Sequence, residues 1–428
     1  MSQTMEQTDN GSLRDQEEPE QKQKSRRPPN TAFRQQRLKA WQPILTPRTV
    51  LPLFFAIGVI FAPIGGLLLW ASSEVQEILI DYTDCNTTAP LCPDGSTIPP
   101  QQQQYYIPSG KISSAFKNST DDADAPTWCK TREDSGLTFA GRRDIPSSVC
   151  HVSFDLPDTL HPPVLLYYQL TNFYQNHRRY VKSFDQEQLV GTFRSNSSIN
   201  GSDCDPLEGE VTDEGVWKAY YPCGLIANSR FNDSIQAPVW LNPNNGAQNQ
   251  TYNMTSNGTA WASDADLYGY PPPYTVNEVI PPPNWRQVYP TYNETYPLPN
   301  LNVDDSFQVW MRTAGLPTFS KLALRNDNEN MPPGRYQIDV YDYFPVLPYD
   351  GTKSLLLSTH TVMGGRNPFL GIAYIVVGGL CILLGAMFTV TQLVKPRKLG
   401  DHSYLSWNTD QPSTATTTGR APRPGDTA

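Results

Sequence analysis

The sequence predicts a membrane protein with two transmembrane helices and a large, β-rich, disulfide-bonded and glycosylated ectodomain between them. The runs Leu51–Ala71 and Phe369–Val394 contain no ionisable residue. Each exceeds the roughly 20 residues that cross a hydrocarbon core. The 297 residues from Ser72 to Pro368 are numerous enough to bury a core of their own, so we expect one or two compact domains there.

The charges that flank the two runs predict the orientation. Four basic residues lie just before the first run, namely Arg34, Arg37, Lys39 and Arg48. Between that run and Lys111, every charged residue is acidic. The second run is followed by the basic segment 395–398. Because basic flanks mark the cytoplasmic side, we expect two cytoplasmic tails around an extracytoplasmic domain. The first helix then acts as the targeting signal, since the preceding residues are too polar for a cleavable signal peptide.

These observations give a predicted domain organisation. In chain order it comprises a disordered cytoplasmic tail at 1–25, a juxtamembrane cytoplasmic segment at 26–49, a transmembrane helix at 50–71, an extracytoplasmic domain at 72–368, a second transmembrane helix at 369–394 and a cytoplasmic tail at 395–428. Within the extracytoplasmic domain, residues 237–301 are rich in sequons, Asn and Pro. We expect them to form an irregular surface insertion, partly polyproline II, rather than a second core.

The juxtamembrane segment contains a candidate partner-binding element. Asn30 or Thr31 could cap a three-turn helix that ends before Pro43, and Phe33, Arg37 and Trp41 would share one face of it. Two interpretations stay open. The segment either lies on lipid headgroups, anchored by its tryptophan, or docks on a cytoplasmic protein.

Cysteines and sequons both concentrate in the predicted ectodomain. Six of the seven cysteines lie there, and Cys381 lies in the second apolar run. An even set in one compartment predicts disulfides, although spacing cannot choose among the fifteen pairings. Nine Asn-x-Ser/Thr sequons predict N-glycosylation, at Asn86, Asn118, Asn196, Asn200, Asn232, Asn249, Asn253, Asn257 and Asn293.

Composition argues against several classes of function. The net charge is −9, and the ectodomain alone holds 19 Lys and Arg against 33 Asp and Glu. Such acidity is unlike that of nucleic-acid-binding surfaces. The five histidines never fall in a metal-ligand spacing, so we predict no metal and no cofactor. Gly-x-Ser-x-Gly, HExxH and P-loop motifs are also missing from the sequence, which leaves an ectoenzyme without support.

Small residues recur within both apolar runs at spacings that place them on one helix face. Stripes of this kind let helix backbones approach closely in lipid. They indicate either that the two helices pack on each other or that they pack on a larger multi-helix partner. The stripes are Gly58, Ala62 and Gly66 in the first run and Gly371, Gly378 and Gly385 in the second.

The ectodomain sequence is typical of a β-rich fold. Segments rich in β-branched and aromatic residues predict strands at Val152–Leu156, Val164–Leu170, Ser306–Met311, Tyr336–Tyr343 and Lys353–Thr359. Thr318–Arg325 is predicted to be a short helix.

Several long sequence words, spread over residues 28–396, resemble one family. They include LTNFYQNHRRYVKS at Leu170–Ser183, PCGLIANSRFND at Pro222–Asp233, FQVWMRTAGLPTFSKL at Phe307–Leu322 and GGRNPFLGIAYIVVG at Gly364–Gly378. The chain resembles the cell-division-cycle-50 family, also called transmembrane protein 30 or the ligand-effect-modulator family. Its members are accessory β subunits of type IV P-type ATPases that flip phospholipids.

The resemblance implies a non-catalytic subunit that forms a heterodimer with the ATPase. It implies an antiparallel β-sandwich-like ectodomain over the lumenal face of the pump, in the secretory and endosomal membranes. It also implies roles in folding, ER exit and activity of the pump, and hence in transfer of aminophospholipids to the cytoplasmic leaflet. The disulfide pairs it implies are Cys85–Cys150, Cys92–Cys129 and Cys204–Cys223.

The sequence word Leu170–Ser183 is rich in aromatic and basic residues, and we call it the aromatic and basic word. It is a candidate contact site for the ATPase or for membrane phospholipids. Phe173, Tyr174, Arg178 and Arg179 belong to it, together with His177 and Tyr180. The alternative is a structural cluster held by cation–π contacts. For the whole protein, the alternative to an ATPase subunit is a glycosylated two-pass receptor or adhesion protein.

Overall fold

The computed structural model describes residues 30–38, 46–93, 96–118, 125–134, 146–242, 248–275, 277–361 and 364–396. The chain divides into two compact units, one formed by Ile57–Cys381 and the other by Met1–Ala56 with Ile382–Ala428. Two helices, α1 (Pro47–Ser73) and α9 (Phe369–Val394), are long and apolar enough to cross a membrane. Helix α1 begins at Pro47, because proline's fixed φ suits the first helical position and its missing N–H costs nothing there.

Five antiparallel strands of the Ile57–Cys381 unit form the first sheet, in the order β12–β5–β14–β1–β2. Strand β5 lies between two neighbours and is buried at five of its seven positions, as its run of apolar residues requires. The strands are β1 Glu77–Asp81, β2 Ile112–Ala115, β5 Val164–Leu170, β12 Phe319–Asn326 and β14 Lys353–Thr359.

The second sheet has the order β10–β9–β13–β4–β3, and β8 also pairs with β13. Its central ladder joins β13 to β4 antiparallel, from Gly334 opposite Leu156 to Asp342 opposite Ser148. The strands are β3 Thr127–Asp134, β4 Pro146–Leu156, β8 Ser234–Ile235, β9 Val239–Trp240, β10 Gln250–Thr251 and β13 Gly334–Asp342.

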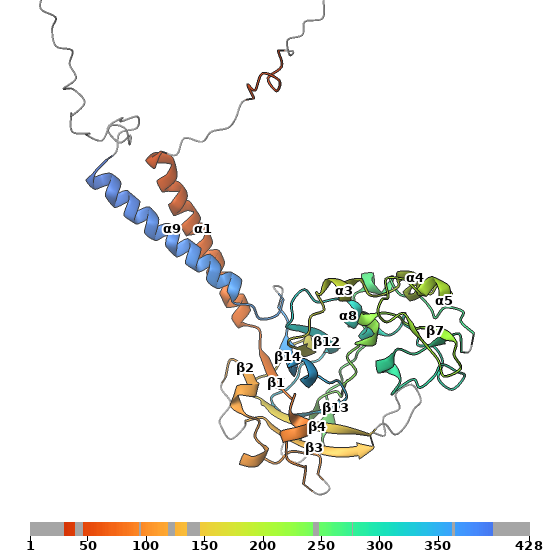
Figure 1. Ribbon diagram of the computed structural model, residues 1–428. Coiled ribbons are helices and arrows are strands. Elements are labelled where there is room, and N and C mark those ends of the chain that lie inside the picture. The colour runs from red at the N-terminus through yellow and green to blue at the C-terminus, as the bar shows by residue number, and fades with distance from the viewer. Residues whose placement is uncertain are drawn as a thin grey trace, which may run out of the picture. The chain divides into compact units, whose positions relative to one another are not determined.

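The two sheets pack face to face as an antiparallel sandwich. Figure 1 shows β3, β4 and β13 in one layer and β1, β12 and β14 in the other. Alternate residues of both sheets point inward, and we call their cluster the sheet core. It includes Ile78 and Ile80 of β1, Leu355 and Leu357 of β14, Val152 and Phe154 of β4, and Ile338 and Val340 of β13. The predicted fold class, two apolar helices around a β-rich ectodomain with disulfides, is confirmed.

The rest of this unit is irregular. A third, small sheet pairs β11 (Val279–Ile280) parallel to β7 (Trp217–Tyr220), which pairs antiparallel with β6 (Gly209–Val211). Short helices α3, α4, α5 and α8 lie near β7 in Figure 1. The helices are α2 Cys85–Thr88, α3 Arg178–Lys182, α4 Gln186–Leu189, α5 Asn196–Ile199, α6 Leu225–Asn228, α7 Ala262–Ala265 and α8 Asp305–Met311, and 3₁₀ turns occur at Gln103–Tyr105, Ser109–Lys111, Pro283–Trp285 and Leu347–Tyr349.

This irregular half has its own hydrophobic cluster, which we call the aromatic core. Its buried members include Tyr168, Tyr221, Trp285, Phe307, Trp310, Phe319 and Phe344. Residues 237–301 contribute to it, because Tyr268, Trp285, Tyr292 and Leu301 are all buried there. The described residues of this segment are mostly irregular, and they are part of a packed core rather than confined to the surface.

Two adjacent predictions are wrong. Ser306–Met311, predicted as a strand, lies in helix α8, where the Asp304 carboxylate accepts a hydrogen bond from the Phe307 N–H at 3.0 Å and caps the helix. Its buried residues Phe307, Trp310 and Met311 lie on one helical face. Thr318–Arg325, predicted as a helix, forms most of strand β12, which pairs with β5 over a long sequence separation.

Candidate functional site

The two long helices contact each other through small residues. In the Ile57–Cys381 unit, a Cβ added at Gly371 would lie 2.8 Å from the Leu69 nitrogen, and one at Gly378 would lie 3.0 Å from the Ala62 nitrogen. These positions therefore pack α9 backbone against α1 backbone. The sequence stripe missed Gly65, whose added Cβ would lie 2.9 Å from the Gly371 carbonyl oxygen.

The other stripe residues differ in their surroundings. In the second compact unit, an added Cβ at Gly385 would meet the Phe55 ring at 3.3 Å. Gly58 is buried. Around Gly66, in contrast, an added Cβ would find no atom within 4 Å, and the same holds for Gly379. Gly66 therefore does not belong to the α1–α9 contact, and its role as a partner-binding residue stays a prediction.

The aromatic and basic word divides into a buried half and an exposed half. The Phe173 ring lies 5.5–6.2 Å from five other aromatic rings, including those of Trp310, Phe319 and Phe344. Tyr180 is linked to Ser229 through their hydroxyls at 2.8 Å. Ring–ring contacts, rather than the predicted cation–π contacts, thus tie this word to the aromatic core.

The exposed half of the word is available to a partner. Tyr174 is 56% exposed, and the side chains of His177 and Arg178 also face solvent. Arg179 forms an ion pair with Asp205 at 2.6 Å, in which both side chains are 60% exposed. Exposed pairs of this kind contribute little to stability, so Arg179 is free to exchange its partner.

The juxtamembrane segment forms a turn rather than the predicted helix within residues 30–38. The Arg37 N–H donates to the Ala32 carbonyl at 2.7 Å, and Gln36 has φ +53°. An L-residue in the left-handed conformation cannot continue a right-handed helix. The turn therefore does not extend into a helix at Gln36. Phe33 is 77% exposed, and the Arg37 guanidinium bonds the Asn30 side chain. Trp41 lies outside the described residues.

Three disulfides lie in the domain between the two long helices, in the pairs that the resemblance implies. Cys85–Cys150 links helix α2 to β4, Cys92–Cys129 holds a loop to β3, and Cys204–Cys223 lies in the aromatic core.

A buried ionic cluster joins the two cores. The Lys353 ammonium, 2% exposed, donates to Asp233 at 2.7 Å, to Asp342 at 2.5 Å and to the Phe344 carbonyl at 2.8 Å. The Tyr82 hydroxyl donates to Asp233 at 2.8 Å. Burial raises the pKa of Asp342, although Lys353 opposes the shift. Tyr82 belongs to the sheet core and Phe344 to the aromatic core, so the cluster fixes one core against the other.

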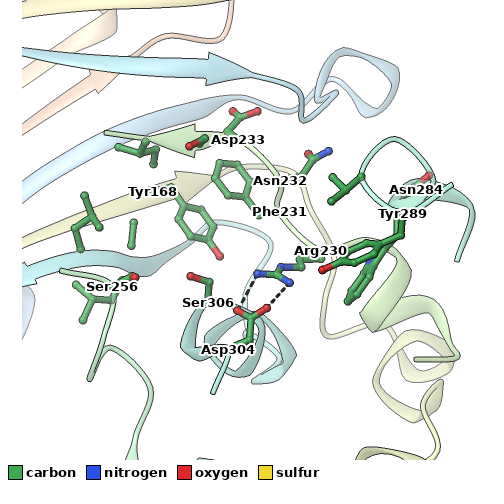
Figure 2. A pocket seen from close by; sticks show the side chains of 17 residues that line it. Tyr168, Arg230, Phe231, Asn232, Asp233, Ser256, Asn284, Tyr289, Asp304 and Ser306 are labelled. Atoms are coloured by element: carbon green, nitrogen blue, oxygen red, sulfur yellow. Dashed lines mark hydrogen bonds and ion pairs between the residues drawn. The ribbon is translucent and has the colours of Figure 1, made fainter. Parts of the chain in front are cut away.

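A pocket of about 350 Å³ lies beside this cluster (Figure 2). Its walls come from the segment after α6, from the loop before α8 and from strands β5 and β12. Arg230 and Asp304 form a two-pronged ion pair across it at 2.7 and 2.9 Å. Other lining residues are Tyr168, Phe231, Asn232, Ser256, Asn284, Trp285, Tyr289 and Ser306.

Sequence reasoning missed both the ionic cluster and this pocket. Arg230 and Asp233 are close together within the word Pro222–Asp233, but the other members of their ionic contacts lie at 304, 342 and 353. The only signal in the sequence was the density of polar and aromatic residues in that word.

The nine sequon asparagines occupy different environments. Asn86, Asn118, Asn200, Asn249, Asn253 and Asn257 are exposed. The Asn196 amide bonds the backbone of β7, through Trp217 at 3.4 Å and Ala219 at 3.1 Å. Asn232 is half-buried, and its Oδ1 has no hydrogen-bond partner. Glycosylation at all nine stays a prediction.

Comparisons with known proteins give the family. A profile of the LEM3 (ligand-effect modulator 3) family / CDC50 family matches residues 68–398. The chain is 41% identical over 393 residues to the phospholipid-transporting ATPase accessory subunit CDC50 of Chaetomium thermophilum, covering 90% of this chain and 92% of that one. It is 38% identical over 391 residues to the accessory subunit CRF1 of Saccharomyces cerevisiae, covering 91% of each.

A mammalian relative matches over a similar span. The chain is 37% identical over 380 residues to cell cycle control protein 50A of Bos taurus, covering 86% of this chain and 89% of that one. The chain has two candidate membrane-spanning helices around a disulfide-bonded β-sandwich, which is the architecture of a two-pass membrane protein with one large domain between its helices. The chain belongs to the LEM3/CDC50 family.

Proposed function

We propose that this chain is the non-catalytic accessory subunit of a phospholipid-transporting P-type ATPase. The observation that carries the proposal is the match, over about nine-tenths of this chain, to proteins named as accessory subunits of such ATPases. The match includes both long helices and the ectodomain between them, so the whole architecture is shared rather than a single motif.

In this role the ectodomain lies on the extracytoplasmic side, and both tails lie in the cytoplasm, as the basic flanks favour. The subunit supports folding, ER exit and activity of the pump in the secretory and endosomal membranes. The lipids moved to the cytoplasmic leaflet are aminophospholipids. The chain itself performs no chemistry on ATP or lipid.

The candidate contacts with the ATPase lie in three places. On the extracytoplasmic side, Tyr174, Arg178 and Arg179 are exposed on an ectodomain that is otherwise acidic. In the membrane, Gly66 offers an uncovered small residue outside the α1–α9 contact. On the cytoplasmic side, Phe33 and Arg37 lie in the juxtamembrane turn. Each place is open to a partner within the part of the chain that is described.

The test is affinity purification of the tagged full-length chain in mild detergent, followed by identification of the proteins that accompany it. We expect a P-type ATPase in stoichiometric amount, absent from a control two-helix glycoprotein. Isolation of the chain with no ATPase would contradict the proposal and would favour a receptor or adhesion role.

A matched pair of variants sharpens this test. Gly378→Leu places a side chain where the Ala62 backbone lies 3.0 Å away, whereas Gly379→Leu enters open space. We expect the first to separate α1 from α9 and to reduce recovery of the ATPase strongly. The second should leave recovery unchanged. Equal recovery with both variants would mean that the helix pair does not shape the ATPase contact.

A further inference from the structure

We infer that the pocket shown in Figure 2 is a carbohydrate-binding site for the first sugar of an N-glycan on Asn232. The inference rests on the proposed glycosylation of that sequon and not on the identity of the ATPase. It concerns what the sugar contacts after the chain has folded.

Position is the first argument. The first sugar of an N-glycan is joined directly to the asparagine side-chain nitrogen, so it must lie within one bond of that amide. Asn232 is part of the pocket lining, and its side chain makes no hydrogen bond within the described part of the protein. A sugar on Asn232 therefore begins at the pocket wall. The volume of about 350 Å³ falls in the range of small-molecule sites.

The charge of the pocket suits a neutral ligand. Its one guanidinium, Arg230, is held in two hydrogen bonds by Asp304. Its other carboxylate, Asp233, is bonded to Lys353. Each charge is thus neutralised by a partner in the protein, which removes the attraction that a phosphate or an ammonium group would need. A sugar carries no charge and requires none.

The uncharged polar groups of the pocket are available to hydroxyl and acetamido groups. Among the described residues, the side-chain hydroxyls of Tyr168, Ser256, Tyr289 and Ser306 make no hydrogen bond to another protein group. Tyr168 is 5% exposed, and Figure 2 shows its hydroxyl directed toward Ser306. Hydroxyl groups that line a pocket can each donate one hydrogen bond and accept others. Sugar hydroxyls can both donate and accept hydrogen bonds, so they can pair with a protein hydroxyl whether it acts as donor or as acceptor.

Aromatic rings complete the site. Trp285 and Tyr289 line the pocket with ring centroids 6.2 Å apart, and the Arg230 guanidinium lies 5.6 Å from the Trp285 ring. Sugar rings have an apolar face of C–H groups, and an N-acetyl group adds a methyl. Both gain contact with aromatic side chains without losing their hydroxyl hydrogen bonds.

Covalent attachment makes even a weak contact effective. A sugar tethered at Asn232 binds intramolecularly, at the high effective concentration that a short linkage gives. Asn86 and Asn200 are exposed and do not line this pocket, so the same sugar at those sequons stays in solvent. The Asn232 glycan should therefore differ from the others in accessibility.

The test compares enzymatic removal of glycans at each site. The folded full-length chain is treated with peptide N-glycosidase in H₂¹⁸O, and mass spectrometry follows the ¹⁸O-labelled aspartate that forms at each sequon. We expect release at Asn232 to be roughly tenfold slower than at exposed occupied sequons, a factor equivalent to about 1.4 kcal/mol. After denaturation all sites should be released alike. An unoccupied Asn232, or native release as fast as at exposed sites, overturns the inference.

A variant of the pocket distinguishes two causes of slow release, namely protection of the Asn232 glycan by the pocket and protection of it by a bound ATPase. Tyr289→Ser removes one aromatic wall and leaves the surface beyond the pocket unchanged. We expect release at Asn232 to reach the rate of the exposed sites while the other sites keep theirs. Continued resistance at Asn232 would mean that something other than the pocket protects the glycan.

A second measurement leaves the aromatic wall of the pocket intact and changes only Ser234, a small residue of the lining. Ser234→Ala removes the sequon but keeps Asn232, so the pocket loses its sugar. Hydroxyl-radical labelling of Tyr289 should then rise severalfold relative to the glycosylated chain. Equal labelling in both would overturn the inference. Both readouts measure the sugar, so failure to recover an ATPase leaves them unaffected.

Discussion

The two cores of the domain between the long helices are similar in size but are held in different ways. Of the described buried residues, ten of 22 in the aromatic core are Phe, Tyr or Trp, against five of 21 in the sheet core. The sheet core lies between ladders such as β13–β4, which pairs nine residues with nine. The aromatic core lies among loops and helices of four to seven residues.

This difference shows how backbone N–H and C=O groups find hydrogen-bond partners where there is no strand ladder. A ladder satisfies its own N–H and C=O groups, whereas loops need side-chain partners. In the aromatic core the Trp285 and Trp310 indole N–H groups donate to the Ala227 and Ile226 carbonyls at 2.8 Å. The Tyr292 hydroxyl donates to the Tyr221 carbonyl at 2.6 Å. Tyr and Trp are suited to this core because each has an apolar ring and a polar tip.

The largest predicted effect comes from breaking the ionic cluster that joins the two cores. Lys353→Met leaves Asp233 and Asp342 buried without their cation, which should lower the free energy of unfolding by about 3–5 kcal/mol. Chemical denaturation of the purified chain, followed by tryptophan fluorescence, measures the loss.

Lys117→Met is the matched control. Lys117 forms an ion pair with Glu74 at 2.6 Å, but its side chain is 52% exposed. We expect a change of at most about 1 kcal/mol. A similar loss in both variants would show that burial of the cluster does not set its importance.

Removal of the disulfide in the aromatic core should have the next largest effect. Cys204→Ala with Cys223→Ala opens a link that spans 19 residues of mostly irregular chain. Loop-closure entropy predicts a loss of about 3 kcal/mol, and we expect retention of the variant in the ER. The midpoint of denaturation and the amount exported measure both. Cys381→Ala, at a cysteine outside the disulfides, should change neither.

Normal export and an unchanged midpoint in the double variant would contradict this expectation. Ring packing alone would then hold the aromatic core. The comparison between the two cores would reduce to their strand content.

The accuracy of the sequence-based predictions also differs between regions of the fold. Strands β5 and β14 have the predicted bounds, because each contains an uninterrupted run of apolar residues. At 305–326 the order of helix and strand was reversed. Aromatic residues suit both elements, and the decisive contacts are the Asp304 cap and the pairing of β12 with β5. The second of these joins residues that are 149 positions apart at Leu170 and Phe319 and 162 apart at Val164 and Asn326, and no local pattern reports it.

The candidate sites were predictable to a similar extent. Glycine spacing predicted Gly371 and Gly378 as helix-contact positions, but Gly65 differs from Gly66 only in its rotation about the helix axis. The word at 170–183 predicted Phe173 as a surface contact or a structural residue, and only the fold places its ring among others. The pocket combines residues between 168 and 324, so its lining required the tertiary structure.

A matched pair of substitutions compares ring packing in the two cores. Phe173 contacts five rings, whereas the Phe154 ring in the sheet core lies 6.4 Å from that of Tyr336. Changing each to Leu keeps most of the apolar volume and removes the ring contacts. We expect a loss of about 2–3 kcal/mol for Phe173→Leu and about 1 kcal/mol for Phe154→Leu. The same denaturation assay measures both, and equal losses would show that the aromatic core does not depend on ring geometry.

The smallest predicted effect concerns the one buried lysine of the aromatic core that the structure describes without a carboxylate partner. Lys321 donates to the carbonyls of Val309, Trp310 and Arg312 at 2.8, 2.9 and 2.5 Å. Burial and the Arg312 charge lower the pKa of Lys321 to about 7. The three carbonyls favour the ammonium, which has three hydrogens to donate, and so limit that shift.

The lowered pKa predicts a pH dependence with a definite sign. Above pH 7 the unfolded chain binds a proton at Lys321 that the folded chain releases, so stability rises with pH between about 7 and the ordinary lysine pKa. The slope should approach, but not exceed, about 1.4 kcal/mol per pH unit. Denaturation at pH 7, 8 and 9 measures it, and Lys321→Met should abolish this contribution. Parallel pH profiles for the chain and the variant would show that the carbonyls hold Lys321 fully charged and that the aromatic core buries a cation as securely as the ionic cluster does.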